Sequence, residues 1–376
     1  MPTPTSFRSR FPALRDTVHL ASCSHGALSD ELIGALSEYQ HTLRTGGAPW
    51  DRWMAEVDTA RAMFARVIGA DYDEIAVVPS ASAGAFQVAS TQDWSDRPRL
   101  VTTDVEFPSI AQVWLAQAPT GVDVVHVAAR DGVVHAEDYL DAVNDQTGLV
   151  SIPLVSYRNG MRLPTADVVA KARAMGISTV VDAYQGAGVV PIDVHDLDCD
   201  YLISGTLKYM LGIPGLAFLY VRAGLVDAIS PIQTGWFGRV NPYEFNPHRV
   251  DYPAHARRFE SGTPSIPAAF GAVAGMRVLE TLDAIEVTAH IADLGDLLDD
   301  SLRAAGEHIA SPAEAKLRGP MVAVRDGDPV RLAAYLRSQH IETSPRGDAV
   351  RLSLHFYNTQ DDVVAVADAI REYRRH

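Results

Sequence analysis

The sequence predicts an α/β protein whose large domain holds a mainly parallel seven-stranded sheet, followed by a smaller α+β domain. Three observations support this. Short apolar runs alternate with amphipathic helical stretches through the middle of the chain, a rhythm typical of βαβ units. Near Ile266 that rhythm gives way to longer helical stretches. The length of 376 residues is enough for one large and one smaller domain.

Seven apolar runs predict the strands of the large sheet. Between several of them lie amphipathic stretches, such as residues 165–175, that are expected to form covering helices. Sheets of this kind bind ligands at the carboxyl ends of their strands, so functional side chains are expected there. The expected strands are residues 75–78, 99–102, 124–127, 149–155, 178–181, 201–203 and 217–221.

The C-terminal pattern predicts a long helix over residues 267–302, short strands near 321–324 and 350–353, and a terminal helix over 360–374. We therefore expect residues 21–265 to form the large domain and residues 266–376 the small domain. Residues 1–20 are expected to form an N-terminal arm that packs against the small domain.

Composition argues against several classes of function. A formal charge of −15 argues against nucleic-acid binding, which needs clustered basic residues. No apolar run approaches the roughly 18 residues that a membrane span requires, and no secretory signal is apparent, so a cytoplasmic location is expected. The two cysteines, Cys23 and Cys199, are too few for a disulfide framework or a zinc site. Cys199 begins an expected strand and is predicted to be a buried, inert thiol.

The strongest functional signal is an acidic residue and a lysine at the ends of two expected strands. Asp182 ends an apolar run, a further strand is expected at residues 190–194, and Lys208 lies 26 positions later (208 − 182). Alone, Asp182 is equally typical of a helix cap and Lys208 of a solvated side chain. As a pair they favour pyridoxal-phosphate chemistry, in which a lysine forms the Schiff base and a carboxylate keeps the pyridine nitrogen protonated.

With Gln185 after the acid and hydroxyl residues before the lysine, the pattern resembles the class V aminotransferase family of fold-type I pyridoxal-phosphate enzymes. That family includes cysteine desulfurases, selenocysteine lyases, kynureninases and isopenicillin-N epimerases. The resemblance runs from about His19 to about Ile370 and implies the fold-type I transferase fold and a homodimer with active sites at the subunit interface. It implies pyridoxal 5′-phosphate on Lys208, Asp182 at the pyridine nitrogen and Gln185 at the phenolic oxygen.

The resemblance also assigns the phosphate site. The family's phosphate-binding turn falls on residues 79–84, where Ala81 and Ser82 lie at an expected helix N-terminus. Near the lysine, desulfurases carry Ser-Gly-His-Lys, whereas this chain has Gly-Thr-Leu-Lys at residues 205–208. The histidine is missing, and Thr206 or Ser204 is expected to supply the phosphate hydroxyl.

Aromatic and cross-subunit contacts follow from further motifs. Phe107, in Glu-Phe-Pro-Ser at residues 106–109, is expected to stack on the cofactor ring. The run Phe-Glu-Ser-Gly-Thr-Pro at residues 259–264 matches the family's Phe-Glu-x-Gly-Thr-Pro, which makes Thr263 a contact to the partner subunit's cofactor. The loop around Trp236 resembles a kynureninase loop that crosses the dimer, and simple packing is the alternative for this residue.

Substrate recognition is expected to rest on Arg351. It begins a run, Arg-Leu-Ser-Leu-His-Phe-Tyr-Asn-Thr at residues 351–359, that matches the family, and an arginine binds a substrate carboxylate in bidentate fashion. Tyr157, Arg158 and Asn159 follow an expected strand and are candidate pocket residues. His25, in the N-terminal segment, is another candidate, with a solvated turn as the alternative.

The reaction is narrowed by an absence. Residues 342–349, just before Arg351, form a short segment without a cysteine, so a persulfide-forming desulfurase is disfavoured. The favoured function is a β-eliminating C–S lyase, in which Lys208 takes the Cα proton of a cysteine S-conjugate. The alternative is a class V aminotransferase, a decarboxylating deaminase or an epimerase acting on an amino acid. A catalytically poor scaffold is disfavoured because Asp182, Gln185, Lys208 and Arg351 are all present.

Overall fold

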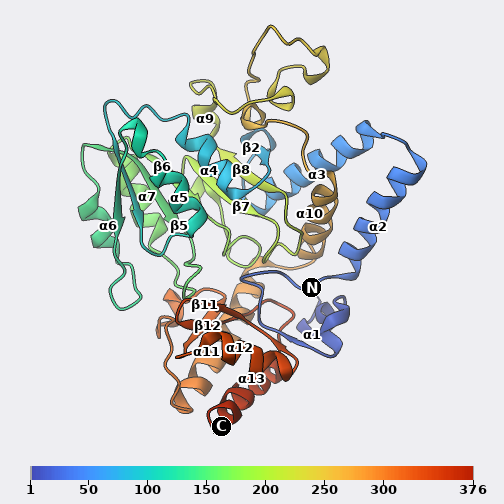
Figure 1. Cartoon of the computed structure of the whole chain (residues 1–376), viewed down its shortest axis with the longest axis vertical. Coiled ribbons are helices and arrows are strands. Elements are labelled where there is room, and N and C mark those ends of the chain that lie inside the picture. The colour runs from blue at the N-terminus through green and yellow to red at the C-terminus, as the bar shows by residue number, and fades with distance from the viewer. Residues whose placement is uncertain (1, 376) are drawn as a thin grey trace.

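The computed structural model describes residues 2–375 and builds them around a seven-stranded mixed sheet (Figure 1). The strand order is β2-β8-β7-β6-β5-β3-β4. Neighbouring strands from β7 to β4 are parallel, whereas β8 is antiparallel to both its neighbours. The mainly parallel sheet predicted from the sequence is therefore confirmed. The strands are β2 Ile75–Val78, β3 Arg99–Thr103, β4 Asp123–Val127, β5 Thr147–Pro153, β6 Ser178–Asp182, β7 Tyr201–Gly205 and β8 Ala217–Val221.

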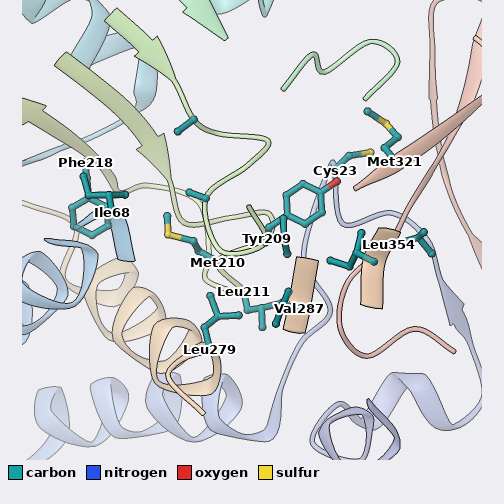
Figure 2. Close-up of a cluster of buried hydrophobic side chains, with 14 of the residues drawn as sticks. Cys23, Ile68, Tyr209, Met210, Leu211, Phe218, Leu279, Val287, Met321 and Leu354 are labelled. Carbon is teal, nitrogen blue, oxygen red and sulfur yellow. The ribbon is translucent and has the colours of Figure 1, made fainter. Parts of the chain in front are cut away.

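Both faces of this sheet are buried, which explains its continuous apolar strands. Successive residues belong to opposite faces, so that Val180 and Val181 of β6 lie in two different hydrophobic clusters. One cluster takes side chains from α3, α7 and α10, and in Figure 2 Ile68 of α3 lies against Phe218 of β8. The other takes side chains from α4 and α5. The helices of this region are α2 Asp30–Thr45, α3 Trp50–Ile68, α4 Ala81–Ala89, α5 Pro108–Leu115, α6 Ala136–Ala142, α7 Thr165–Ala174, α8 Val194–Leu197, α9 Ala223–Val226 and α10 Ile266–Leu279.

The C-terminal region has its own antiparallel sheet, in the order β11-β12-β9. The N-terminal residues lie beside it: β1 pairs in parallel with β10, and Arg8 Nη1 of α1 lies 2.8 Å from Asp362 Oδ2 of α13 (Figure 1). Met1 and His376, the ends of the expected arm and small domain, lie outside the described residues. The elements are α1 Pro4–Arg8, β1 Val18–His19, α11 Ala284–Ala304, β9 Met321–Arg325, α12 Pro329–Ser338, β10 Ile341–Glu342, β11 Ser344–Arg346, β12 Ala349–Ser353 and α13 Gln360–Tyr373.

Two expected elements differ from the structure. The stretch 267–302 is not one helix, because α10 ends at Leu279 and the Asp283 side chain caps a new helix, α11, at its start. The strand expected at residues 190–194 was also wrong. Pro191 has no backbone N–H to give to a ladder, and the Asp193 carboxylate instead accepts the N–H groups of His195 and Asp196 to begin α8. None of the helices within residues 2–375 is long and apolar enough to cross a membrane.

A buried ion pair ties the segment before α10 to the sheet. Arg61 Nη2 of α3 lies 2.6 Å from Glu260 Oε1, and the same oxygen accepts the Val77 N–H of β2 at 3.0 Å. The Arg61 side chain is fully buried and that of Glu260 nearly so. Burial by itself would lower the pKa of Arg61, but Glu260, Tyr72 and Asp58 together raise it above its ordinary value, so the arginine stays charged. Glu260 thus holds the motif that carries Thr263.

Replacing Glu260 with alanine should strongly destabilise the protein, because it removes the buried counter-ion of Arg61 and leaves only the partly exposed Asp58 as its acidic partner. The expected loss in the free energy of unfolding is about 3–5 kcal/mol. Urea denaturation followed by circular dichroism measures it. Glu280→Ala is the matched control. Glu280 pairs with Arg66, which lies in α3 like Arg61, but at an exposed site. This substitution should lower the free energy of unfolding by less than about 1 kcal/mol. Equal urea midpoints for the two variants would contradict the buried-pair assignment.

Candidate functional site

A cavity of about 280 Å³ opens at the carboxyl ends of β5, β6 and β7. This is where parallel sheets of this type bind ligands. Its walls come from the ends of these strands, from the first turns of α4 and α5, and from the turn after β7. They include Ser80, Ala81, Ser82, Phe107, Pro153, Tyr157, Asp182, Tyr184, Gln185 and Lys208.

Asp182 is the last residue of β6, and the parallel register sets it beside Pro153 of β5 and Ile203 of β7. Its Oδ1 accepts the Tyr184 N–H at 2.8 Å, which turns the chain sharply at the strand end. Burial raises the pKa of Asp182, while the Tyr184 N–H and the positive charge of Lys208 oppose that rise. A carboxylate held here faces the cavity with one oxygen bound to the backbone.

Lys208 lies in the turn after β7, against the N-terminal segment. Gly26 donates its N–H to the Leu207 carbonyl, and a Cβ on Gly26 would lie 2.4 Å from the Lys208 carbonyl oxygen, so only glycine permits this approach. Lys208 Nζ makes no hydrogen bond or ion pair within residues 2–375. Burial lowers the pKa of Lys208 to about 8, although Asp182 opposes the shift. An appreciable fraction of the amine is therefore neutral near physiological pH, as a nucleophile requires.

The N-terminus of α4 forms the opposite wall. The Ser80 hydroxyl caps the helix by accepting the Ala83 N–H at 3.2 Å. The N–H groups of Ala81 and Ser82, in the helix's first turn, make no hydrogen bond in the described part of the chain. Unpaired N–H groups at a helix start carry partial positive charge and suit an anion.

Phe107 immediately precedes α5, and its ring lies close to Lys208 and Tyr157. Lys208 Nζ lies 5.3 Å from the centre of the ring, and the Tyr157 ring meets it edge-on at 5.1 Å. The ring therefore presents an aromatic surface inside the cavity. Its backbone is fixed by a side chain, since the Phe107 N–H donates to Glu106 Oε1 at 2.8 Å.

Glu106 is a second buried carboxyl group that sequence reasoning did not single out. Ser151 donates its hydroxyl to Glu106 Oε2 at 3.1 Å, and the Trp114 indole N–H donates to the same serine oxygen at 3.1 Å. Burial and the charge of Asp182 together raise the pKa of Glu106 to about 8. Its position directly before Phe107 was the available signal, but the sequence does not reveal its burial.

Gln185 carries an amide into the cavity with one unsatisfied atom. Its Nε2 donates to the Cys23 carbonyl at 3.1 Å, whereas its buried Oε1 has no partner among the described residues. Buried polar atoms are nearly always paired, so this atom suggests that a polar ligand completes the site. Cys23 is buried beside it, and Figure 2 shows the Tyr209 hydroxyl pointing toward the Cys23 side chain.

Arg351 lies behind the cavity wall. Its Nη1 donates to the Tyr157 carbonyl at 2.8 Å, and its Nη2 donates to the Ser344 hydroxyl at 2.6 Å. The side chain is almost fully buried, and its charge contributes to the lowered pKa of Lys208. Seven of the residues expected from the sequence line the cavity itself, namely Ala81, Ser82, Phe107, Tyr157, Asp182, Gln185 and Lys208.

Other expected site residues lie elsewhere. Thr206 donates its hydroxyl to the Ile213 carbonyl at 2.9 Å and is not among the lining residues. Arg158 and Asn159 line a different cavity, where Asn159 Nδ2 donates to the carbonyls of Gly132 and Ala310. Thr263 is exposed and does not line the cavity, and His25 is exposed in the N-terminal segment.

The Cys199 thiol is inaccessible to solvent and is much less acidic than a reactive thiol. It is completely buried at the start of β7, and burial together with the nearby Asp200 charge raises its pKa to about 12. The prediction of a buried thiol at this position is confirmed.

Comparisons with known proteins identify the family of this chain. The aminotransferase class-V family model matches residues 35–366. The protein named Uncharacterized aminotransferase YcbU, from Bacillus subtilis (strain 168), is 35% identical over 369 residues, covering 98% of this chain and 97% of that protein. A kynureninase from Deinococcus radiodurans is 31% identical over 308 residues, covering 78% of this chain and 71% of that protein.

The fold is shared with a solved structure. An apo cysteine desulfurase from Thermococcus onnurineus NA1 superposes with a TM-score of 0.90 at 22% sequence identity, covering 99% of this chain and 98% of that one. The predicted fold class is thus confirmed. With a family model that spans most of its length, this chain belongs to the aminotransferase class-V family, whose members use pyridoxal 5′-phosphate.

Proposed function

We propose that this chain is a pyridoxal-phosphate enzyme acting on an amino acid, and that Lys208 binds the cofactor covalently. One observation carries the proposal: the Lys208 amine, the Asp182 carboxylate and the N-terminus of α4 line the same cavity. The amine can form a Schiff base with the cofactor aldehyde, and the carboxylate can pair with the protonated pyridine nitrogen. The helix N-terminus can bind the cofactor phosphate.

The other lining residues fit the same group. The N–H groups of Ala81 and Ser82, with the Ser82 hydroxyl, would hold the phosphate. Phe107 would cover one face of the ring, and the Gln185 amide would reach the ring oxygen. Gln185 Oε1 has no partner in residues 2–375, which is what a site built around a polar ligand would leave.

Bound in this way, the cofactor would supply an electron sink for the substrate Cα. The Lys208 amine would take the Cα proton and return it. Asp182 keeps a proton on the ring nitrogen through its negative charge. Arg351, behind Tyr157, supplies positive charge for the substrate carboxylate.

We infer that the reaction is β-elimination of a sulfur group from a cysteine S-conjugate. The segment before Arg351 holds no cysteine, and the Cys199 thiol is buried with a raised pKa. Cys23 lies on a buried segment whose N–H is bonded to the Ser353 hydroxyl and whose carbonyl is bonded to Gln185. With no mobile thiol to receive sulfur, sulfur leaves with the departing group.

Amino-group transfer is the second candidate, because the protein named as an aminotransferase is 35% identical over 98% of this chain. Epimerisation begins with the same removal of the Cα proton by Lys208 and ends with a proton returned to the opposite face of Cα. Deamination with decarboxylation instead breaks the bond between Cα and the carboxylate.

A second copy of the chain is proposed as the partner. Apolar side chains are unusually exposed in the segment that projects at the top of Figure 1, with Phe245 at 70% and Ile232 at 77%. This segment packs beside the loop that carries Thr263, since the Phe237 N–H donates to the Ser261 carbonyl at 3.2 Å. An exposed apolar patch next to a residue expected to reach a partner's cofactor favours a homodimer.

Lys208→Ala should abolish covalent attachment of the cofactor. Wild-type protein loaded with pyridoxal 5′-phosphate and reduced with borohydride should carry the added mass on the peptide that contains Lys208, whereas the variant should not. Lys171→Ala, which removes an exposed lysine of α7, should behave like wild type. In the apo protein, capture of the cofactor should quicken as pH rises through about 8, because burial lowers the pKa of Lys208 to about 8 and only the neutral amine attacks. Attachment at another lysine would refute the assignment.

A substrate panel separates the two reactions. Incubation with S-substituted cysteines should release pyruvate and a thiol or sulfenate, read by mass spectrometry. A new amino acid formed from an added keto acid, with no pyruvate released, would overturn the lyase proposal and favour amino-group transfer.

Phe245→Glu should weaken self-association, because it places a charge in the exposed apolar segment. Light scattering on purified protein should give a dimer mass for wild type and a larger monomer fraction for the variant. Glu244→Gln, at the adjacent residue, is the control. A wild-type protein that is monomeric at micromolar concentration would contradict the proposed homodimer.

A further inference from the structure

The Lys208 amine lies close to two aromatic rings, those of Phe107 and Tyr184. Phe107 is proposed to cover the cofactor ring, whereas Tyr184 has no role in the proposal above. Lys208 Nζ is 5.3 Å from the centre of the Phe107 ring but only 4.1 Å from the centre of the Tyr184 ring. Tyr184 lines the cavity, and the bond from its N–H to Asp182 holds its backbone at the end of β6. Its side chain therefore belongs to the wall of the site rather than to the core.

The Tyr184 ring occupies space that a missing side chain leaves free. A Cβ built on Gly205, the last residue of β7, would lie 2.3 Å from both Cζ and the hydroxyl oxygen of Tyr184. Any residue other than glycine at position 205 would therefore displace the ring. The Tyr184 ring, just after β6, can take this position only because Gly205, at the end of β7, has no side chain.

This arrangement places the tyrosine hydroxyl at the anion end of the cavity. One turn into α4, an ideal Cβ on Gly84 lies 3.5 Å from Ile203 Cγ2, so α4 runs over β7. Because α4 begins at the carboxyl end of the sheet, its first turn lies above Gly205, where the Tyr184 hydroxyl is found. That hydroxyl has no hydrogen-bond partner among the described residues.

The two hydroxyls that the sequence offered from the β7 side, those of Thr206 and Ser204, are engaged elsewhere. The Thr206 hydroxyl donates to the Ile213 carbonyl at 2.9 Å. Ser204 is fully buried, and its hydroxyl donates a long hydrogen bond to the Gly205 carbonyl at 3.4 Å. The Tyr184 hydroxyl, in the turn after β6, has no hydrogen-bond partner among the described residues and lines the cavity.

We propose that Tyr184 is a cofactor-contacting residue whose hydroxyl, admitted by the missing side chain at Gly205, donates a hydrogen bond to the cofactor phosphate. The inference rests on the proposed function and adds to it a residue and a steric condition. Burial and the negative charge of Asp182 raise the pKa of Tyr184 to about 12, so its hydroxyl keeps the proton that it donates.

Tyr184→Phe should raise the dissociation constant for pyridoxal 5′-phosphate about tenfold or more, because it removes one hydrogen bond to a charged group and keeps the ring. Titration of the apo protein, followed by the yellow absorption of the bound cofactor and by tryptophan fluorescence, measures this constant without turnover. Tyr220→Phe removes a buried phenol from β8 outside the cavity and should leave the constant unchanged. A Tyr184→Phe variant that binds as wild type does would overturn the inference.

An exchange of side chains tests the steric condition. Gly205→Ser should weaken binding, because its Cβ collides with the Tyr184 ring. Tyr184→Ala should weaken it through loss of the donor. The double variant has room for the serine, whose hydroxyl replaces the lost one, so it should bind more tightly than either single variant. A double variant no better than the singles would also overturn the inference, provided that circular dichroism shows all three to be folded.

A wrong cofactor assignment and a wrong role for Tyr184 would give different results. If wild-type protein binds no pyridoxal 5′-phosphate, or binds it at a residue other than Lys208, the proposed function itself is wrong. If wild type binds and Lys208→Ala abolishes the covalent bond, yet Tyr184→Phe changes nothing, only the role of Tyr184 is wrong.

Discussion

The parallel register between β6 and β7 is the constraint on which the rest of the site depends. Asp182 pairs with Ile203, which places the carboxylate at the end of one strand close to the turn that carries Lys208 beyond the next. A shift of one residue would turn the Asp182 side chain to the other face of the sheet. Because Val180, Val181 and Leu202 are all fully buried, the apolar packing that stabilises the fold also prevents such a shift.

Burial then sets the charges of the groups that this register brings together. Lys208 loses much of its affinity for a proton, and Glu106 holds its proton more strongly than a free carboxyl group does. A neutral Glu106 leaves Asp182 as the negative partner of the lysine. The Glu106 side chain still orders the site, since it binds the Phe107 N–H and the Ser151 hydroxyl.

Sequence patterns foresaw the features that depend on local order. The strands could be predicted because both faces of the sheet are buried, which makes the strands continuously apolar. The Asp182–Lys208 pair could be predicted because neighbouring parallel strands end at the same edge of the sheet. The run at residues 190–194 misled because apolar composition does not reveal that Pro191 and Asp193 favour a helix start.

The sequence did not reveal which side chains of the turns after the strands face the cavity. Of the three candidate pocket residues at positions 157–159, only Tyr157 lines the Lys208 cavity, whereas Asn159 is held by the carbonyls of Gly132 and Ala310. Tyr184 escaped notice for a similar reason. Its place depends on what is absent at Gly205, 21 positions away (205 − 184), and only the packed strands bring the two together.

The N-terminal segment has a consequence for how the protein is made. Residues 18–19 pair with residues 341–342, Ser353 donates its N–H to the Leu20 carbonyl, and Gly26 then lies against the turn of Lys208. The ribosome synthesises this segment 323 positions before its first strand partner (341 − 18). The segment that lies against the Lys208 turn therefore stays unpaired until the residues around 341–353 have emerged.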